Sequence, residues 1–189
     1  MADRENRREQ MLDAAAALFE QRGYQATSVR QIAERVGCTE AALYYHFKGG
    51  KRELLQQVLA TVAPDFESAL DNLQDAESLR DLIMCYGQAV AGLQGGKLHR
   101  TLRWLVSEFQ HLQNEERDLF YERLLSARAR IASLVLPFVR DSGQADEIAW
   151  LLLSTSFGYR QLFIDLEIRA LAHQDVTHLF QLLADGLCP

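Results

Sequence analysis

The sequence predicts an all-α protein in which a small head of three helices at the N-terminus precedes a larger helical body. Composition is the first reason, because the 189 residues include only three prolines and eleven glycines and are rich in helix-favouring residues. Periodicity is the second reason, since apolar residues recur at helical spacing without strand-like alternation. The break "KGGK" at 48–51 separates the two parts, so we expect domains at residues 1–50 and 51–189.

The first helix of the head is expected from about residue 5 to residue 22, where Gly23 ends it. Its helical spacing is carried by the apolar residues Leu12, Ala15, Ala16, Phe19 and Tyr24. A second helix follows, and Ser28 with Gln31 has the spacing of a capping box at its start. The residues that this helix is expected to bury are Val29, Ile32, Ala33 and Val36.

A third short helix completes the head. Gly37 lies where a helix commonly ends in the left-handed conformation, and Thr39 can cap the helix that follows. The inward residues of this helix are expected to be Phe47 and either Ala42 or Leu43. Two short helices about a Gly-containing turn form a helix-turn-helix unit.

The body is expected to consist of longer helices. The first begins at Lys51 and meets Pro64, where it must kink or restart because proline removes a donor and clashes with the preceding turn. Another runs from about Glu115 to Arg140 and is interrupted near Pro137. The other helical patterns are residues 77–93, 98–112, 146–171 and 175–187, of which 146–171 is apolar nearly all round.

Charge is unevenly distributed between the two parts. The net charge is −6, yet the first 52 residues hold nine Lys and Arg against seven Asp and Glu, a net of +2. The remainder therefore carries −8. A mildly basic head on an acidic body suits a protein whose head alone meets a polyanion.

Several other classes of protein are disfavoured. The N-terminus is polar where a signal peptide would be apolar, and no apolar run approaches the roughly 20 residues of a membrane-spanning helix. We therefore expect a cytoplasmic protein. Neither a disulfide framework nor a zinc site is indicated, because three cysteines occur at no regular spacing: Cys38, Cys85 and Cys188. No cofactor is expected.

Enzymatic function is not expected. A hydrolytic site could be sought among Ser154, Ser156, His173, Asp175 and His178, but no nucleophile elbow or paired acid–base spacing frames them. The two histidines are five residues apart rather than four, and no third ligand is evident, so no metal site is expected.

Residues 23–59, "GYQATSVRQIAERVGCTEAALYYHFKGGKRELLQQVL", resemble the DNA-binding head of the tetracycline-repressor (TetR) family of bacterial regulators. The sequence departs from the family pattern at Gly49-Gly50, which loosens the link before the fourth helix, and at Cys38, a turn position usually held by an aliphatic residue. The resemblance implies a transcriptional regulator that binds double-stranded operator DNA as a homodimer. It rests on coincident features, namely Gly23, Thr27-Ser28, Ile32-Ala33, Gly37, "LYYHF" and Lys51.

A recognition helix presents its N-terminal side chains to base edges in the major groove, while the preceding helix crosses the backbone. Ala41 and Ala42 permit close approach to thymine methyl groups, and Glu40 could accept a hydrogen bond from cytosine N4. The resemblance implies that Arg30 can reach a guanine, and Lys51 would hold a phosphate. The residues expected to contact DNA are Thr27, Ser28, Arg30, Thr39, Glu40, Ala41, Ala42, Tyr44, Tyr45, His46, Lys48 and Lys51.

Other roles stay open for some of these residues. Tyr44 and Tyr45 are expected to clamp phosphates through their hydroxyls, but they could instead pack beneath the first helix. Arg30 could be a solvated surface residue. Glu40 is as consistent with a bystander as with a base reader.

The last two helices are expected to form the dimer interface, because residues 146–171 carry more apolar surface than one side of a bundle can bury. In the family the corresponding helices form a four-helix bundle across the dimer axis. The alternative is that these residues are all intramolecular core. The interface residues predicted here are Leu151, Thr155, Gly158, Leu162, Leu179, Leu182 and Leu183.

The middle helices are expected to enclose a small-molecule effector, which we predict to be hydrophobic or aromatic. If effector binding releases the DNA, the protein is a repressor. Pro64 is a candidate place for the helix to bend in that change. Core packing or surface exposure is the alternative for each candidate. The predicted effector-binding residues are Met84, Gln88, Arg103, Trp104, His111, Phe120, Tyr121, Phe157 and Arg160. The rival function is a helical interaction module whose head no longer binds DNA.

Overall fold

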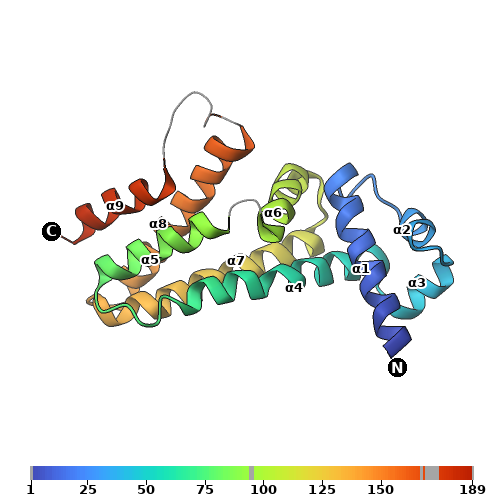
Figure 1. The fold of residues 1–189 in the computed structure, drawn as a ribbon, viewed down its shortest axis with the longest axis horizontal. Helices are drawn as coiled ribbons and strands as arrows, with labels where there is room; N and C mark the ends of the chain where they lie inside the picture. Colours follow the sequence, from blue (N-terminus) through green and yellow to red (C-terminus); the bar gives the residue numbers. More distant parts are fainter. Residues whose placement is uncertain (1, 94–95, 167, 169–174, 189) are drawn as a thin grey trace. The chain divides into compact units, whose positions relative to one another are not determined.

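A computed structural model describes the backbone of residues 2–93, 96–166, 168 and 175–188, and their side chains apart from those of residues 2–5 and 62–66. This part of the chain is all-α, as the sequence predicts (Figure 1). The head comprises α1 (Ala2–Arg22), α2 (Val29–Val36) and α3 (Glu40–His46). The longer elements are α4 (Gly50–Asp71), α5 (Leu79–Gly92), α6 (Lys97–Glu108), α7 (Asn114–Val135), α8 (Ser142–Tyr159) and α9 (Val176–Leu187).

The chain divides into two compact units. Residues 1–64 and 95–120 form the first unit, so the head shares a unit with α6 and the start of α7. Residues 65–94 and 121–189 form the second. A domain boundary at residue 50 stays a prediction, although the packing of the head continues beyond that residue.

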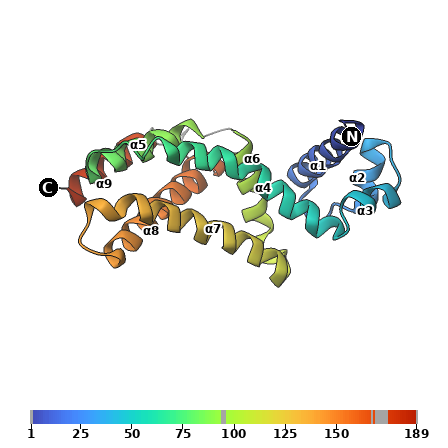
Figure 2. The same ribbon diagram turned by 90° about the horizontal axis from the view of Figure 1, so that it is seen from below.

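The first unit is held by a core that joins α1 to α2, α3, the start of α4 and α6 (Figures 1 and 2). Phe19 of α1 packs against Tyr24 at 5.1 Å and against Trp104 of α6 at 5.5 Å between ring centroids. Ile32 and Ala33 of α2 are buried as predicted, whereas Val29 and Val36 are only partly buried. The head is thus anchored by its apolar faces.

In the second unit α5 and α9 lie side by side (Figure 2). Tyr86 meets Phe180 edge to face, with ring centroids 5.4 Å apart. The contact is close because Gly87 leaves room for the ring, since a Cβ at Gly87 would lie 2.7 Å from the Cβ of Phe180. Val176, Phe180 and Ala184 are the buried residues of α9, at the i, i+4, i+8 spacing of one helix face.

The prolines have different effects. One helix covers residues 50–71, so α4 does not restart at Pro64, and a kink there stays a prediction. The interruption predicted near Pro137 is confirmed, because α7 ends at Val135 and a 3₁₀ turn, η2 (Leu136–Phe138), follows. The helix predicted over 146–171 is divided into α8 and a π-helical turn, η3 (Arg160–Asp165), and part of its end lies outside the described residues.

Candidate nucleic-acid interface and small-molecule pocket

The helix-turn-helix is fixed by local hydrogen bonds that the sequence predicts. Ser28 and Gln31 form a complete capping box, in which the Gln31 amide donates to Ser28 Oγ at 3.2 Å and the Ser28 amide donates to Gln31 Oε1 at 2.8 Å. Gly37 ends α2 in the left-handed region at φ 70°, a conformation that costs glycine least. Thr39 then caps α3 by accepting from the Ala42 amide at 3.2 Å.

Helix α3 presents one face inward and one to solvent. Leu43 and Phe47 are fully buried, which decides between the two predicted registers, and Ala42 is half-buried. The exposed residues at its N-terminal end include Thr39, Glu40 and Ala41. This is the arrangement that a recognition helix needs, since buried anchors set its angle and small or polar side chains face outward.

Tyr44 and Tyr45 are 47% and 60% exposed, so the alternative in which they pack beneath the first helix is wrong. The Tyr44 ring packs closely on Gly50, since a Cβ at Gly50 would lie 3.0 Å from the Cε1 atom of Tyr44. Gly50 also has φ 61°, in the left-handed region that favours glycine. The ring of Tyr45 meets that of His46 edge to face at 5.4 Å. Together with the exposed Lys48, these side chains place hydroxyl, imidazole and ammonium groups at the C-terminal end of α3.

Arg30 lies exposed on α2 and is paired with Glu34 of the same helix, with Nε 2.8 Å from the carboxylate. This hydrogen bond and the charge of Glu34, with a smaller contribution from Glu40, raise the pKa of Arg30. A guanine contact by Arg30 therefore requires that the guanidinium leave Glu34 or be shared with it.

Thr27 is a correction to the set of predicted DNA contacts. Its side chain is buried, and its hydroxyl donates to the carbonyls of Gly23 at 2.8 Å and Leu18 at 3.3 Å. The hydroxyl thus closes the end of α1 and is not available to a phosphate.

Lys51 is also turned inward. Its ammonium donates to the carbonyl of Tyr24 at 3.1 Å and lies 4.3 Å from the centroid of the Tyr24 ring. Partial burial lowers the pKa of Lys51, whereas the charges of Glu116 and Glu108 raise it. A phosphate contact by Lys51 stays a prediction, but within the first unit its charge is already used to fix the turn after α1.

That turn is docked on the corner between α6 and α7 by three hydrogen bonds, of which the one from Tyr24 to Glu116 is buried. The Tyr24 hydroxyl donates to Glu116 at 2.5 Å. The backbone amide of Gln25 donates to Glu108 at 2.9 Å, and its side chain donates to the carbonyl of His111 at 2.8 Å. Burial and the neighbouring carboxylate of Glu116 raise the pKa of Tyr24. We call these bonds the turn–corner network.

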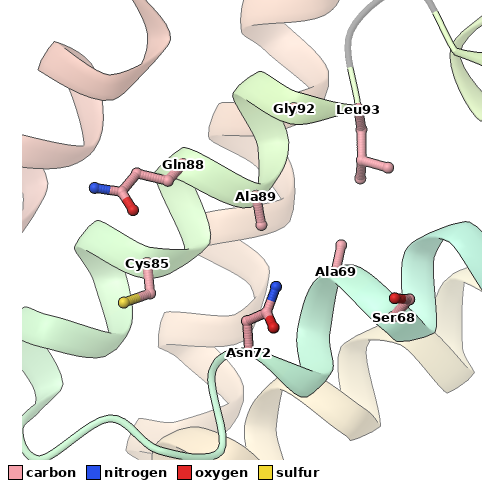
Figure 3. A pocket seen from close by; sticks show the side chains of 8 residues that line it. All are labelled: Ser68, Ala69, Asn72, Cys85, Gln88, Ala89, Gly92 and Leu93. Atoms are coloured by element: carbon pink, nitrogen blue, oxygen red, sulfur yellow. The ribbon is translucent and has the colours of Figure 1, made fainter.

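The second unit contains a hollow of about 440 Å³ between α4 and α5 (Figure 3). Its polar lining is uncharged, consisting of hydroxyl, carboxamide and thiol groups beside small apolar residues. Burial and the nearby carboxylate of Asp81 raise the pKa of the Cys85 thiol, so it is mainly neutral. The lining residues are Ser68, Ala69, Asn72, Cys85, Gln88, Ala89, Gly92 and Leu93.

Among the predicted effector-binding residues, Gln88 lines this hollow. Met84 is half-buried against the core of the second unit. Tyr121 and Phe157 belong to the same unit and are exposed. In the first unit Trp104 is core, Phe120 packs at its edge, and Arg103 and His111 are exposed. Sequence reasoning missed the other lining residues, because small and neutral side chains carry no signal of a site.

Arg160 is buried and ion-paired rather than open to a ligand. Its Nη1 lies 2.6 Å from Asp165, and its guanidinium lies 5.0 Å from the centroid of the Phe157 ring. The i, i+5 pairing fits the π-helical turn, whose hydrogen bonds span five residues. Desolvation lowers the pKa of Arg160, and Asp165 opposes the shift. Among the described residues, Nη2 of Arg160 and Oδ1 of Asp165 find no hydrogen-bond partner.

Several predicted interface residues of the second unit are exposed. Leu151 is 37%, Leu162 47% and Leu182 55% exposed, while Thr155, Leu179 and Leu183 are partly buried. A Cβ at Gly158 would meet no atom of the described residues within 4 Å, so the helix surface there leaves room for close approach. The alternative in which all these residues are intramolecular core does not hold for the exposed leucines.

The enzymatic alternative gains no support from the described side chains. Asp175 caps α9 by accepting from the Thr177 amide at 2.8 Å, and Ser156 donates to the carbonyl of Leu152 at 2.8 Å. His173 lies outside the described residues. No cluster of metal-binding side chains occurs in the part of the chain that the structure describes. None of the helices in that part is long and apolar enough to cross a membrane.

Comparison with known proteins agrees with this architecture. Residues 11–58 match the family model described as bacterial regulatory proteins, tetR family. The transcriptional repressor KstR2 of Rhodococcus jostii is 29% identical over 62% of this chain and 57% of its own length. The transcriptional regulator SrpR of Pseudomonas putida is 29% identical over 92% of this chain and 79% of its own. The chain spans about half the length of the first curated relatives that it matches.

The same agreement extends to a solved structure. NalD, the secondary repressor of the MexAB-OprM multidrug efflux pump in Pseudomonas aeruginosa, superposes with a TM-score of 0.74 at 25% identity and covers 97% of each chain. The fold and the exposed N-terminal end of α3 thus define a helix-turn-helix head joined to a helical body. Residues 11–58 thus match the DNA-binding head of the TetR family, and the chain as a whole resembles TetR-family transcriptional regulators.

Proposed function

We propose that the protein is a repressor that binds a palindromic operator as a homodimer and releases it when an effector binds. The observation that carries the DNA-binding part is helix α3, whose N-terminal residues Thr39, Glu40 and Ala41 are exposed while Leu43 and Phe47 anchor it. KstR2 and NalD, which resemble this chain, are named as repressors, and this supports the direction of control.

Base recognition is proposed for the start of α3 and for Arg30. Ala41 has a small exposed side chain that can approach a thymine methyl group, and Glu40 can accept from cytosine N4. Arg30 can exchange Glu34 for the O6 and N7 atoms of guanine, a bidentate contact. Tyr44, Tyr45, His46, Lys48 and the Ser28 region would set the register through phosphates.

Dimerisation is proposed through the exposed leucines of α8, η3 and α9. An isologous interface uses the same patch on both subunits, and Leu151, Leu162 and Leu182 supply apolar surface for it. Two heads related by a two-fold axis would read half-sites roughly 34–36 Å apart, which is one turn of DNA.

The hollow between α4 and α5 is proposed as the entry to the effector site. Its volume of about 440 Å³ lies within the range of small-molecule sites, and its neutral lining favours an uncharged hydrophobic or aromatic molecule. Ligand-driven release requires that the effector favour one conformation of the body over another. A coupling of about 1–3 kcal/mol would lower operator affinity roughly 5–150-fold.

The direct test is a gel-shift titration of the purified protein with the inverted repeat nearest its coding region. A specific complex whose affinity falls steeply with salt supports the proposal, because counterion release accompanies phosphate binding. Arg30→Ala should relax discrimination at one base pair of the operator. Arg103→Ala on α6 is the control and should leave both the affinity for the operator and the base preference unchanged. Absence of any preference over competitor DNA would leave the interaction-module alternative.

The effector part is tested separately by a thermal-shift screen of hydrophobic, aromatic and small charged compounds. Hits among the first two groups should weaken the complex in the gel shift, and Ala89→Phe, which fills the hollow, should abolish their effect. Tighter DNA binding with a hit would reverse the direction of control. Hits confined to small charged compounds would contradict the proposed effector class.

A further inference from the structure

Arg8, in the first part of α1, adds a cation to the end of the recognition helix. Its guanidinium lies 5.0 Å from the centroid of the Phe47 ring. Phe47 is fully buried and caps the C-terminus of α3, so Arg8 covers that end of the helix. His46 precedes Phe47 in the chain and the exposed Lys48 follows it. The charge of Arg8 therefore lies beside the groups at which phosphate contact is proposed.

The guanidinium of Arg8 lies over the Phe47 ring, and its N–H groups are not used by any other described residue. Arg8 makes no hydrogen bond or ion pair with any side chain or backbone group of the described residues. Arg117 provides a comparison within the same unit, because it lies over Phe109 at 5.7 Å yet donates to the carbonyls of Phe109 at 3.3 Å and Gln110 at 2.9 Å. Arg117 is thus a structural arginine, whereas the N–H groups of Arg8 have no partner among the described residues.

We infer that Arg8 is a phosphate-binding residue of the head, additional to the contacts made from α2 and α3. This inference rests on the proposed DNA-binding function. A guanidinium held over an aromatic ring has its N–H groups in the plane of a rigid fork, which matches the geometry of a phosphate. Because the stack holds the side chain, less conformational entropy is lost on binding than for a freely rotating arginine.

The salt dependence of DNA binding measures such a contact. Each neutralised phosphate contributes about 0.9 to the slope of log affinity against log salt concentration. One contact therefore contributes about eightfold between 1 M and 0.1 M salt, and a dimer would lose two contacts when Arg8 is replaced. The loss should be equal for all sequences, since phosphates carry no sequence information.

The experiment is fluorescence anisotropy of the full chain with a mixed-sequence duplex of about 30 base pairs over a range of NaCl concentrations. Arg8→Gln should reduce the slope by about one for each subunit bound. Arg117→Gln removes a stacked arginine whose N–H groups are engaged, and it should keep the wild-type slope. Arg8→Met retains an unbranched stem over the Phe47 ring, so it should stay folded and lose the same slope as Arg8→Gln. Circular dichroism confirms the fold of each variant.

The outcomes separate this inference from the proposed function. If the wild-type protein does not bind the duplex at low salt, the DNA-binding proposal itself fails. If the wild-type protein binds and a folded Arg8 variant keeps the full slope, Arg8 only covers Phe47 and the inference is overturned. A loss of slope in Arg117→Gln as large as that in Arg8→Gln would also overturn it, because the effect would then follow net charge alone.

Discussion

Replacing Tyr24 by phenylalanine tests the turn–corner network at its shortest hydrogen bond. The substitution keeps the ring that packs on Phe19 at 5.1 Å and lies under the Lys51 ammonium at 4.3 Å. It removes only the hydroxyl that donates to Glu116 at 2.5 Å. Glu116 is 7% exposed, so solvent cannot readily replace the lost donor.

The size of the effect follows from the charge of the acceptor and its burial. A hydrogen bond to a charged group contributes about 1.5–3 kcal/mol to stability, and a buried acceptor left unpaired costs its desolvation energy. Glu116 would retain the Gln113 amide at 2.9 Å on its other oxygen, which limits the loss. We therefore expect Tyr24→Phe to lower the free energy of unfolding by about 1.5–3 kcal/mol.

Urea denaturation at neutral pH measures this difference. The matched control is Tyr86→Phe, because Tyr86 is also buried but its hydroxyl oxygen accepts a neutral hydrogen bond, from Ser156 at 3.2 Å, rather than bonding to a charged group. That control should cost about 0.5–1.5 kcal/mol. If Tyr24→Phe is as stable as the wild type, or loses no more than Tyr86→Phe, the network does not stabilise the fold as argued.

Three further predictions concern the second unit. Gly87→Ala should lower stability by about 1–3 kcal/mol in urea denaturation, since the new Cβ would lie 2.7 Å from that of Phe180; unchanged stability would show that α9 can shift freely. Asp165→Ala should lower the free energy of unfolding by about 3 kcal/mol or more, because it leaves the Arg160 guanidinium buried without its partner. Adding Arg160→Met should restore much of this loss. Equal stabilities for the single and double variants would contradict the argument. Burial raises the pKa of Tyr86 to about 12, and the bond from Ser156 opposes the shift. The unfolded chain therefore loses this proton first, so the stability that Tyr86 contributes is fully present below about pH 10. This stability should fall between about pH 10 and 12 by up to about 1.4 kcal/mol per pH unit. Tyr86→Phe should flatten that part of the curve of unfolding free energy against pH.

The parts of the fold that the sequence predicts best are those fixed within a few residues. The capping box of Ser28 and Gln31, the left-handed Gly37 and the Thr39 cap are all confirmed, because each depends on partners at most four residues away. The interruption near Pro137 is confirmed for the same reason. Local stereochemistry is enough to place these features.

The roles that sequence reasoning missed depend on partners far along the chain. Tyr24 meets Glu116, 92 residues later, and Lys51 is held by the carbonyl of Tyr24, 27 residues earlier. Thr27 is a different case, because its acceptors are only four and nine residues earlier, but the resemblance to the family motif assigned its hydroxyl to DNA rather than to the end of α1. No spacing rule pairs such residues, so an inward-facing lysine or threonine cannot be told from an outward-facing one before the fold is known.

The turn–corner network also determines how the head can be studied in isolation. A fragment ending at residue 50 would lack Lys51, Glu108 and Glu116, and Phe19 would lose its neighbour Trp104. The tyrosine at the end of the first helix would then expose both its ring and its hydroxyl to water. Dissection of this molecule at the motif boundary should therefore yield a poorly folded peptide, and binding studies with such a peptide would underestimate the intact regulator.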